Sequence, residues 1–441
     1  MVNLAPGSAR PRAAGTFELL TGLMLVLLFT ISAMLLFQLG IHYESPGGSV
    51  LHKIHPATFL AVFTLGFFIL RHSHPVVYAN DLMKQHKGTL IFLLGWCLLL
   101  AYLIFVQKQP FTPLIDTFLM PVFVFLILLQ LGEDSRHHLA LLLHGLMFLN
   151  AAIGYYEFLS GDRLIPLMAG DLLLKDEWRS SALFGHPLMN ASLTGSYLLI
   201  LAFGGGKDLP VLSRPLIMVM TLGALVVFGG RASLVLSLLI IVLLGLAKVM
   251  ALASGSRFGL GGAILVVAAV PVLALVGLVL LEAGFFDQLI GRFVNDKGST
   301  VARFAMFDLF HVLNMRDILF GPDPGVIATE MKLQGLVGIE SFWIAFVLSY
   351  GLIISCVFFA GLFFFLADVA SEVRASGVLI IIYYMLVAST SVSLSAKITN
   401  FGMFLALLLV MMPRVRTLWV APAAGDPEFA GGQQGNGSYW V

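Results

Sequence analysis

Long apolar runs, separated by short polar breaks, account for most of this chain. An α-helix needs about 20 mostly apolar residues to cross the roughly 30 Å hydrocarbon core of a bilayer. Windows of that length predict about twelve transmembrane helices. The expected spans are Phe17–Gly40, Ile54–Leu70, Gly88–Val106, Thr112–Leu131, Leu139–Leu159, Pro187–Phe203, Val211–Phe228, Ala232–Val249, Leu260–Leu281, Ile339–Ala367, Gly377–Ser393 and Ile398–Met412. The pattern therefore predicts an all-α polytopic membrane protein whose single transmembrane domain covers residues 1–412.

The composition excludes a soluble fold. Of the 441 residues, 59% are hydrophobic and 11% are charged, whereas about 25% are charged in an ordinary soluble domain. The net charge of +1 gives the chain no overall electrostatic character and no reason to bind nucleic acid. Cys97 and Cys356 both fall within apolar runs, so we expect buried free thiols. No Cys/His spacing resembles a zinc or haem site.

Positive charges are spread unevenly over the connections between spans. With the N-terminus inside, most lysines and arginines of the short connections lie on the inner side. The short outer connections carry little more than Lys53, Lys108, Arg231 and Lys397. The positive-inside rule therefore places both termini in the cytoplasm. Two longer loops, 160–185 and 282–338, are predicted on the outer face, and the Gly- and Gln-rich tail 413–441 is predicted to be a disordered cytoplasmic segment.

The second outer loop is expected to contain a helix of its own. The run TVARFAMFDLFHVLNM begins at Thr300 and is followed by the turn-forming GPDPG at 321–325. Helical spacing places most of its apolar side chains along one side, which would be the packed side. These side chains are Val301, Phe304, Phe307, Leu309, Val312 and Met315. Arg303 and Asp308 would then face a polar cleft.

Arginine recurs on the predicted outer face, at Arg179, Arg231, Arg292 and Arg303. A guanidinium is always charged, and its planar fork binds phosphate oxygens in pairs. Several arginines that converge beside the bilayer would suit a lipid-linked diphosphate, and they would also stabilise that group as it leaves. Plainer alternatives remain open: an interfacial anchor for Arg179, a span-end anchor for Arg231, and solvated loop charges for the other two.

Two residues are candidates for a catalytic base. Glu340 opens the tenth expected span, and its alternative role is that of an acid stabilised by the helix dipole. His186 has a suitable intrinsic pKa, but it can instead cap the sixth span or bind phosphate or sugar. Asp116 and Glu157 lie in or near apolar spans, where charges are costly and often functional, although Glu157 could simply mark the interface.

Four segments with these residues occur in a fixed order. They are RSSALFGHPLMN at Arg179–Asn190, FGGRAS at Phe228–Ser233, STVARFAMFDLF with DILFGPDPG inside Ser299–Gly325, and GIESFWIAFVLSYGL at Gly338–Leu352. In order, sidedness and spacing they resemble the O-antigen ligase and O-antigen polymerase superfamily of bacterial polysaccharide assembly. The N-terminal spans resemble that family only in hydrophobicity and number.

The resemblance implies a metal-independent glycosyltransferase of the bacterial inner membrane, without a cofactor, whose active site faces the periplasm. Donor and acceptor would be glycans on undecaprenyl pyrophosphate. The diphosphate-binding role of the family's arginines carries over by motif to Arg179, Arg231 and Arg303, and by loop position to Arg292. Ligases of the family characteristically have a histidine near the start of the tenth span, and this chain has Glu340 in that neighbourhood. This difference favours a polymerase of O-antigen or exopolysaccharide repeat units.

Two other functions stay open from the sequence. A ligase would transfer finished glycan to lipid A-core or to a protein. A transporter or flippase of lipid-linked sugars would have paired repeats, broken helices and a charged cavity at the membrane midplane. No internal repeat is visible in the sequence, and the outer arginines favour chemistry at one face. Membrane lipids are expected partners, as are a chain-length regulator or other proteins of polysaccharide assembly.

Overall fold

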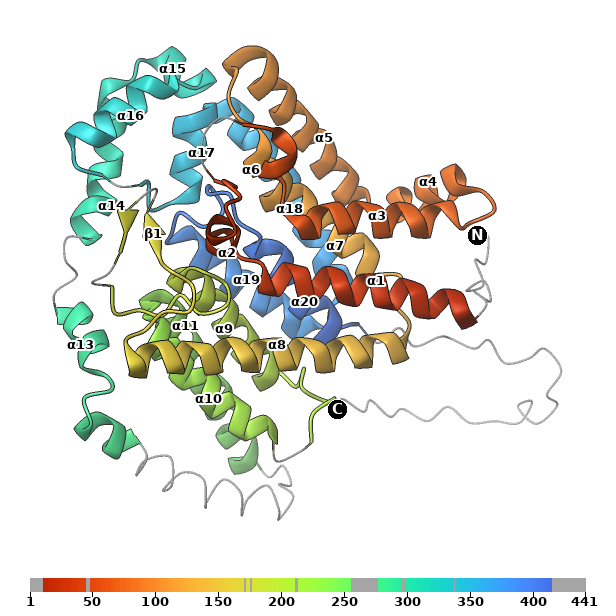
Figure 1. Ribbon diagram of the computed structural model, residues 1–441, viewed down its shortest axis with the longest axis vertical. Helices are drawn as coiled ribbons and strands as arrows, with labels where there is room; N and C mark the ends of the chain where they lie inside the picture. Colours follow the sequence, from red (N-terminus) through yellow and green to blue (C-terminus); the bar gives the residue numbers. More distant parts are fainter. Residues whose placement is uncertain are drawn as a thin grey trace.

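The computed structural model describes residues 11–44, 48–169, 172–174, 177–210, 213–254, 277–294, 299–336 and 338–414. Within them the named elements are helices, apart from two short strands. β1 (Met168–Ala169) pairs antiparallel with β2 (Leu172–Leu173). Figure 1 shows the helices gathered into one bundle, with α1 (Pro11–Thr30) and α8 (Glu133–Ser160) running across it side by side. An all-α membrane architecture is consistent with this arrangement.

The remaining elements follow in chain order. They are α2 (Ala33–Gln38), η1 (Val50–Lys53), α3 (Pro56–Leu70), α4 (Pro75–Gln85), α5 (Lys87–Ala101), η2 (Tyr102–Gln107), α6 (Thr112–Leu114), η3 (Ile115–Leu119), α7 (Met120–Leu128), α9 (Pro187–Ala202), α10 (Ser213–Phe228), α11 (Arg231–Ala253), α13 (Asp287–Val294), α14 (Ser299–Asp308), η4 (Leu309–Val312), α15 (Met315–Phe320), α16 (Pro324–Leu333), α17 (Phe342–Tyr350), α18 (Leu352–Glu372), α19 (Ala375–Ser389) and α20 (Asn400–Met411).

Helix length and apolar composition identify the candidate membrane spans. Among the described residues, four helices are long and apolar enough to cross a bilayer: Lys87–Gln107, Glu133–Ser160, Arg231–Ala251 and Leu352–Glu372. The pair α3 and α4, bent by 114°, would make a fifth if it counts as one span. Shorter apolar helices occupy other expected spans, and Leu260–Leu281 lies largely outside the described residues. The number twelve therefore stays a prediction.

Two expected spans are interrupted in the structure. The first breaks after α1 because Ser32 accepts a hydrogen bond from Leu35 N at 3.2 Å and starts α2 anew. The tenth is two helices, α17 and α18, because Gly351 turns the chain with a φ of 82° where it packs against the backbone of Phe320 and Gly321. A single helix over Ile339–Ala367 was therefore a wrong prediction, since these contacts come from distant parts of the chain.

One end of the bundle collects connections that the charge pattern places inside. His138 contacts Glu18 at 2.8 Å and so joins the start of α8 to the start of α1. His137 contacts Asp208 at 2.6 Å and joins α8 to the connection that follows α9. These contacts give the predicted inner connections a common location.

The opposite end collects predicted outer connections. Asp116 at the start of the fourth span accepts hydrogen bonds from Tyr43 Oη at 2.7 Å and from His55 N at 3.1 Å. Thr117 donates to the carbonyl oxygen of Ala396 at 2.9 Å, in the connection between α19 and α20. The structure thus sorts the two sets of connections to opposite ends. That this second end faces the periplasm rests on the positive-inside rule.

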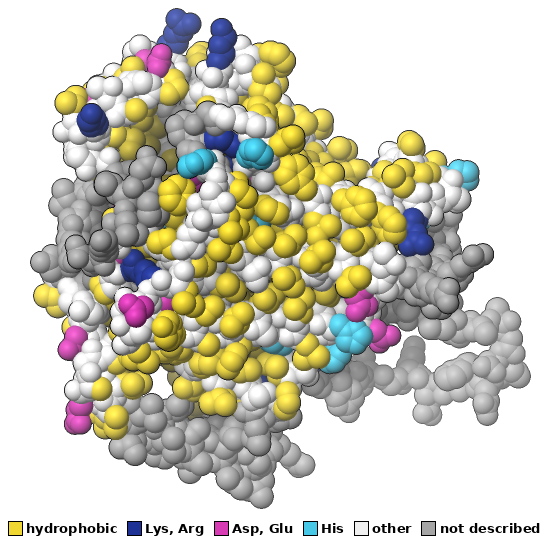
Figure 2. Space-filling view, in the orientation of Figure 1, with side chains coloured by type: hydrophobic (Ala, Val, Ile, Leu, Met, Phe, Trp, Pro, Cys, Tyr) yellow, Lys and Arg dark blue, Asp and Glu magenta, His cyan; other side chains and the backbone are white. Residues whose placement is uncertain are grey.

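The surface matches a lipid environment. Figure 2 shows hydrophobic side chains covering the middle of the visible face, with most charged side chains near its margins. α20 is buried almost throughout, whereas α11 exposes most of its apolar side chains. Cys97 and Cys356 are also exposed, which corrects the expectation that both thiols are buried. In water such exposure would be costly, and in hydrocarbon it is not.

The outer loop 282–338 is helical but packs differently from the expectation. Met306 and Leu309 are buried side chains of α14 and η4, while Phe304 is 70% exposed and Met315 is 69% exposed. The chain also leaves α-helical geometry at η4, so the expected apolar stripe is not one continuous face. The loop helix exists, but among the described side chains predicted on its packed side only Leu309 is buried.

The contact between α5 and α18 gives a test of the fold. A Cβ on Gly88 would lie 2.1 Å from the carbonyl oxygen of Phe364, so Gly88→Ala must push the two helices apart. We expect it to lower the free energy of unfolding by about 2–3 kcal/mol. Gly66→Ala is the control, because no atom lies within 4 Å of the position of its added Cβ. Unfolding in mixed detergent micelles that showed equal stability for both variants would contradict this packing.

Candidate functional site

A buried carboxylate holds the loop that carries the first arginine motif. Glu157, near the end of α8, is 4% exposed. Its Oε2 accepts hydrogen bonds from Ser180 Oγ at 2.6 Å, Ser181 N at 3.0 Å and Ala182 N at 2.8 Å. Its Oε1 accepts from Leu164 N at 3.1 Å. One side chain thereby satisfies three backbone N–H groups that have no helix or sheet partner.

Two asparagines fix the rest of this loop against the bundle. Asn150 Oδ1 in α8 accepts from Leu183 N at 3.0 Å. Asn190 Nδ2 in α9 donates to the carbonyl oxygens of Ser181 at 2.6 Å and His186 at 3.0 Å. These side-chain hydrogen bonds to the loop backbone favour one loop conformation. That conformation includes Ala182 at a φ of 41°, which a non-glycine residue adopts only when its surroundings impose it.

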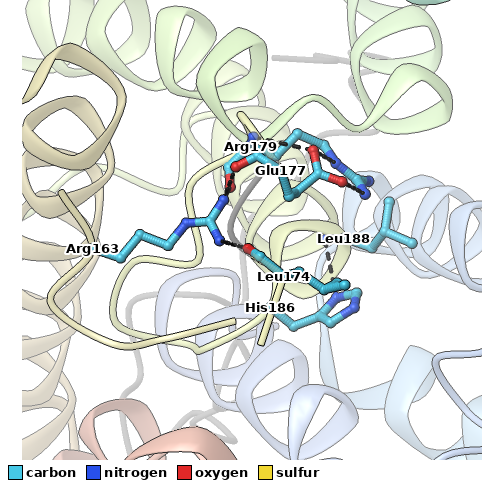
Figure 3. Close-up of polar contacts among 6 residues, drawn as sticks. All are labelled: Arg163, Leu174, Glu177, Arg179, His186 and Leu188. Carbon is cyan, nitrogen blue, oxygen red and sulfur yellow. Dashed lines mark hydrogen bonds and ion pairs between the residues drawn. The ribbon is translucent and has the colours of Figure 1, made fainter. Parts of the chain in front are cut away.

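Arg163 has a structural role in the same loop. Its Nη1 donates to the carbonyl oxygen of Leu174 at 2.8 Å, and its Nη2 donates to the carbonyl oxygens of Glu177 and, at 3.0 Å, Arg179. Figure 3 shows Arg163 reaching these atoms from the side opposite the Arg179 guanidinium. Because its donors are occupied by backbone oxygens, Arg163 positions Arg179 rather than offering its own charge to a ligand.

Arg179 lies between an acid and the second arginine motif. Its guanidinium binds Glu177 through Nε at 2.9 Å and Nη2 at 2.7 Å, and its side chain is 15% exposed. A Cβ added to Gly229 would lie 2.7 Å from Arg179 Cδ. Gly229, with a φ of 62°, has no side chain, so the Arg179 side chain can pack across this turn. Arg231, two residues later, begins α11. Two motifs separated by about fifty residues are brought together here.

His186 caps α9, which was the plainer of its predicted roles. Its Nδ1 accepts a hydrogen bond from Leu188 N at 3.2 Å, and Pro187 occupies the first helical position (Figure 3). His55 and Pro56 begin α3 in the same way. A ring whose Nδ1 accepts carries its proton on Nε2 in the neutral form. Neutral His186 is thus a hydrogen-bond donor toward a ligand, which favours substrate binding over proton abstraction.

The surroundings of His186 keep its ring neutral. The side chain is exposed, yet it lies among the protein groups at the mouth of the loop. Desolvation, followed by the charge of Arg179, lowers the pKa of His186 to about 4. Both causes disfavour a second positive charge beside the Arg179 guanidinium, so the pKa of His186 falls.

The structure describes fewer contacts for the other residues predicted from the sequence. Glu340 lies just before α17, between Gly338, which faces Val392, and Trp343, whose Nε1 donates to Ser389 Oγ at 2.7 Å. It therefore belongs to the outer end, on its α19 side. The Arg292 and Arg303 side chains lie outside the described part of the chain, so their roles stay predictions.

Comparison with known protein families, with curated proteins and with solved structures finds no match for this chain. Its function is therefore inferred from its own residues and contacts.

Glu157 provides a stability test of the site. Glu157→Ala would leave the buried N–H groups of Ser181 and Ala182, the partly buried N–H of Leu164 and the Ser180 hydroxyl without their acceptor. We therefore expect a loss of about 3 kcal/mol in the free energy of unfolding. Limited proteolysis should then cut the 160–185 loop faster. Glu133→Ala, at the exposed start of the same helix, is the control and should change stability by less than about 1 kcal/mol. Equal effects of the two substitutions would contradict the role given to Glu157.

Proposed function

We propose that this chain is a membrane-embedded glycosyltransferase that uses a glycan linked to a lipid diphosphate as its donor. The observation that carries the proposal is the contact of the Arg179 stem with the Gly229 turn, which brings the first two arginine motifs to one place at the predicted outer end. Half-buried guanidinium groups beside a bilayer bind phosphate oxygens strongly, because water and salt screen them little.

The reaction follows from the charges that must be stabilised. A hydroxyl oxygen of the acceptor sugar attacks the anomeric carbon of the donor, and the bond from that carbon to the diphosphate oxygen breaks. Arg179 and Arg231 stabilise the negative charge that develops on the leaving diphosphate. The hydroxyl proton passes to a base, for which Glu340 is the candidate. His186 donates Nε2–H to a phosphate or sugar oxygen.

Glu177 has a defined place in this scheme. It neutralises Arg179 in the chain without substrate, and the cost of a half-buried lone cation is thereby avoided. An incoming diphosphate would share the guanidinium with Glu177 or displace it. Glu177 would then favour diphosphates over less charged ligands, because a weakly charged ligand could not compete with the existing ion pair.

The expected setting is the periplasmic face of a bacterial inner membrane, with undecaprenyl-pyrophosphate-linked O-antigen or exopolysaccharide repeats as substrates. The absence of the ligase histidine at Glu340 favours polymerisation over transfer to lipid A-core or protein. Analysis of the glycans that accumulate separates these reactions: loss of a polymerase leaves single repeats, whereas loss of a ligase leaves long glycan on its lipid carrier.

Arg179 and Glu177 form a matched pair for testing the reaction. In proteoliposomes supplied with a lipid-diphosphate oligosaccharide, Arg179→Ala should lower the rate of elongation by about a hundredfold, because transition-state charge loses a donor. Glu177→Gln breaks the same ion pair but keeps the cation, so it should retain at least about half of the activity. If both variants lost activity equally, the ion pair would have only a structural role.

His186 separates hydrogen-bond donation from base catalysis. His186→Gln, which keeps an N–H donor, should retain activity within about threefold, whereas His186→Ala should lose about tenfold. Because the pKa of His186 is lowered to about 4, its titration should leave the rate unchanged from pH 8 to 5 and affect it only as pH falls through about 4. An inflection near pH 6.5 that His186→Gln removes would indicate a catalytic base instead.

A further inference from the structure

A second buried polar cluster lies at the same end of the bundle, centred on Asp116. This residue is fully buried in η3. Its two oxygens accept from Tyr43 Oη at 2.7 Å, from Thr58 Oγ1 at 2.7 Å and from His55 N at 3.1 Å. The negative charge of Asp116 is therefore used to join the first outer connection to α3 and η3.

Two lysines border this cluster, and one of them has no hydrogen-bond partner among the described residues. Lys397 Nζ donates to the carbonyl oxygen of Tyr43 at 2.8 Å and lies 3.6 Å from the centre of the Tyr43 ring. Lys53, at the end of η1, extends past Gly48, and its Nζ is buried. Among the residues that the structure describes, no hydrogen-bond partner is found for Lys53 Nζ. A buried ammonium without an acceptor is costly, which points to an anionic ligand.

Two carboxylates lie near the lysines, and Asp116 attracts Lys397. Asp116 is occupied by the donors named above. Burial raises the pKa of Glu44 above its usual value, although Lys397 opposes this shift. Burial, as the largest cause, lowers the pKa of Lys397 to about 8, against the attraction of Asp116 and with the added repulsion of Lys53. An anion bound by both ammonium groups would offset their repulsion and would give the buried Lys53 ammonium an acceptor.

The lysine pair lies close to the arginine loop. His55 Nε2 is 2.6 Å from the carbonyl oxygen of Ile31. The next residue, Ser32, meets Gly185 so closely that an added Cβ there would lie 2.8 Å from Ser32 Cβ. Gly185 directly precedes His186. The two polar regions are therefore neighbours around the start of α2 (Figure 1).

We propose that Lys53 and Lys397 form a second anion site, which binds the phosphate or diphosphate group of a ligand distinct from the one held by Arg179. The evidence for this site does not depend on the reaction proposed above. If that reaction occurs, the second site would hold the diphosphate of the acceptor lipid while Arg179 holds that of the donor. Two sites side by side would bring the sugar hydroxyl of one lipid next to the anomeric carbon of the other.

The test counts anion sites on the full-length protein in lipid nanodiscs. Inorganic diphosphate is titrated calorimetrically into wild type, Lys53→Met, Arg179→Ala and the double variant. We expect two sites in wild type, one in each single variant and none in the double variant, with affinity at the lost site reduced at least about tenfold. Farnesyl diphosphate, titrated in the same way, distinguishes the sources: tighter binding at the Lys53 site identifies a lipid headgroup, and equal binding identifies a soluble anion.

The midpoint of thermal unfolding, measured without any anion, shows whether a variant that loses binding is still folded. Lys53→Met removes an unpartnered ammonium but keeps the length of the side chain, so its midpoint should equal or exceed that of wild type. Lys108→Met, at an exposed outer lysine, is the control and should change neither midpoint nor binding. Unchanged diphosphate binding in Lys53→Met would overturn the second site. Lost binding in Lys53→Met with none lost in Arg179→Ala would uphold it and refute the arginine site.

Discussion

The outer end of this protein depends on the hydrogen bonds that Glu157 accepts. The backbone N–H groups of Ser181 and Ala182 are buried in the protein, so they need a protein acceptor in place of water. Glu157 accepts from the backbone of Leu164, Ser181 and Ala182, and this fixes where the chain turns before α9. Arg179 and His186 lie on either side of that turn, so their positions follow from it. The arginine contact with Gly229 and the histidine cap therefore flank a turn that this buried carboxylate holds, together with Arg163 and the two asparagines.

A common design underlies the two polar clusters. In each, a buried acid at the outer end of a span binds backbone N–H groups and hydroxyls of a neighbouring connection, and cationic side chains lie around it. Glu157 does this for the Arg179 loop, and Asp116 does it for the segment that includes Lys53 and Lys397. In both proposed sites the acid holds the backbone in place, and the cations would bind an anion.

Much of the fold could be predicted from the sequence, because apolar run length is itself the signal for a membrane helix. The interruptions could not be predicted. The break at Ile31 depends on a cap at Ser32, and the break at Gly351 depends on the approach of Phe320, which is distant in sequence. The exposed thiols and the misplaced apolar side of α14 have a related cause. Hydrophobicity alone does not show whether a side chain meets protein or lipid.

The candidate site was predicted in part. Arg179 and Arg231 were chosen from separate motifs, and the structure brings their segments together. Glu157 carried a visible signal, an acid at the end of an apolar run, but its role depends on loop atoms that spacing cannot locate. For His186 the tautomer decides between donor and base, and only the Leu188 contact reveals it.

A structure of the full-length protein with farnesyl diphosphate, determined by electron cryomicroscopy in nanodiscs, tests the central claim most directly. The account predicts phosphate density within hydrogen-bond distance of the guanidinium groups of both Arg179 and Arg231. Density confined to the opposite end of the bundle, or an Arg231 side chain turned away from Arg179 in the bound state, would contradict it.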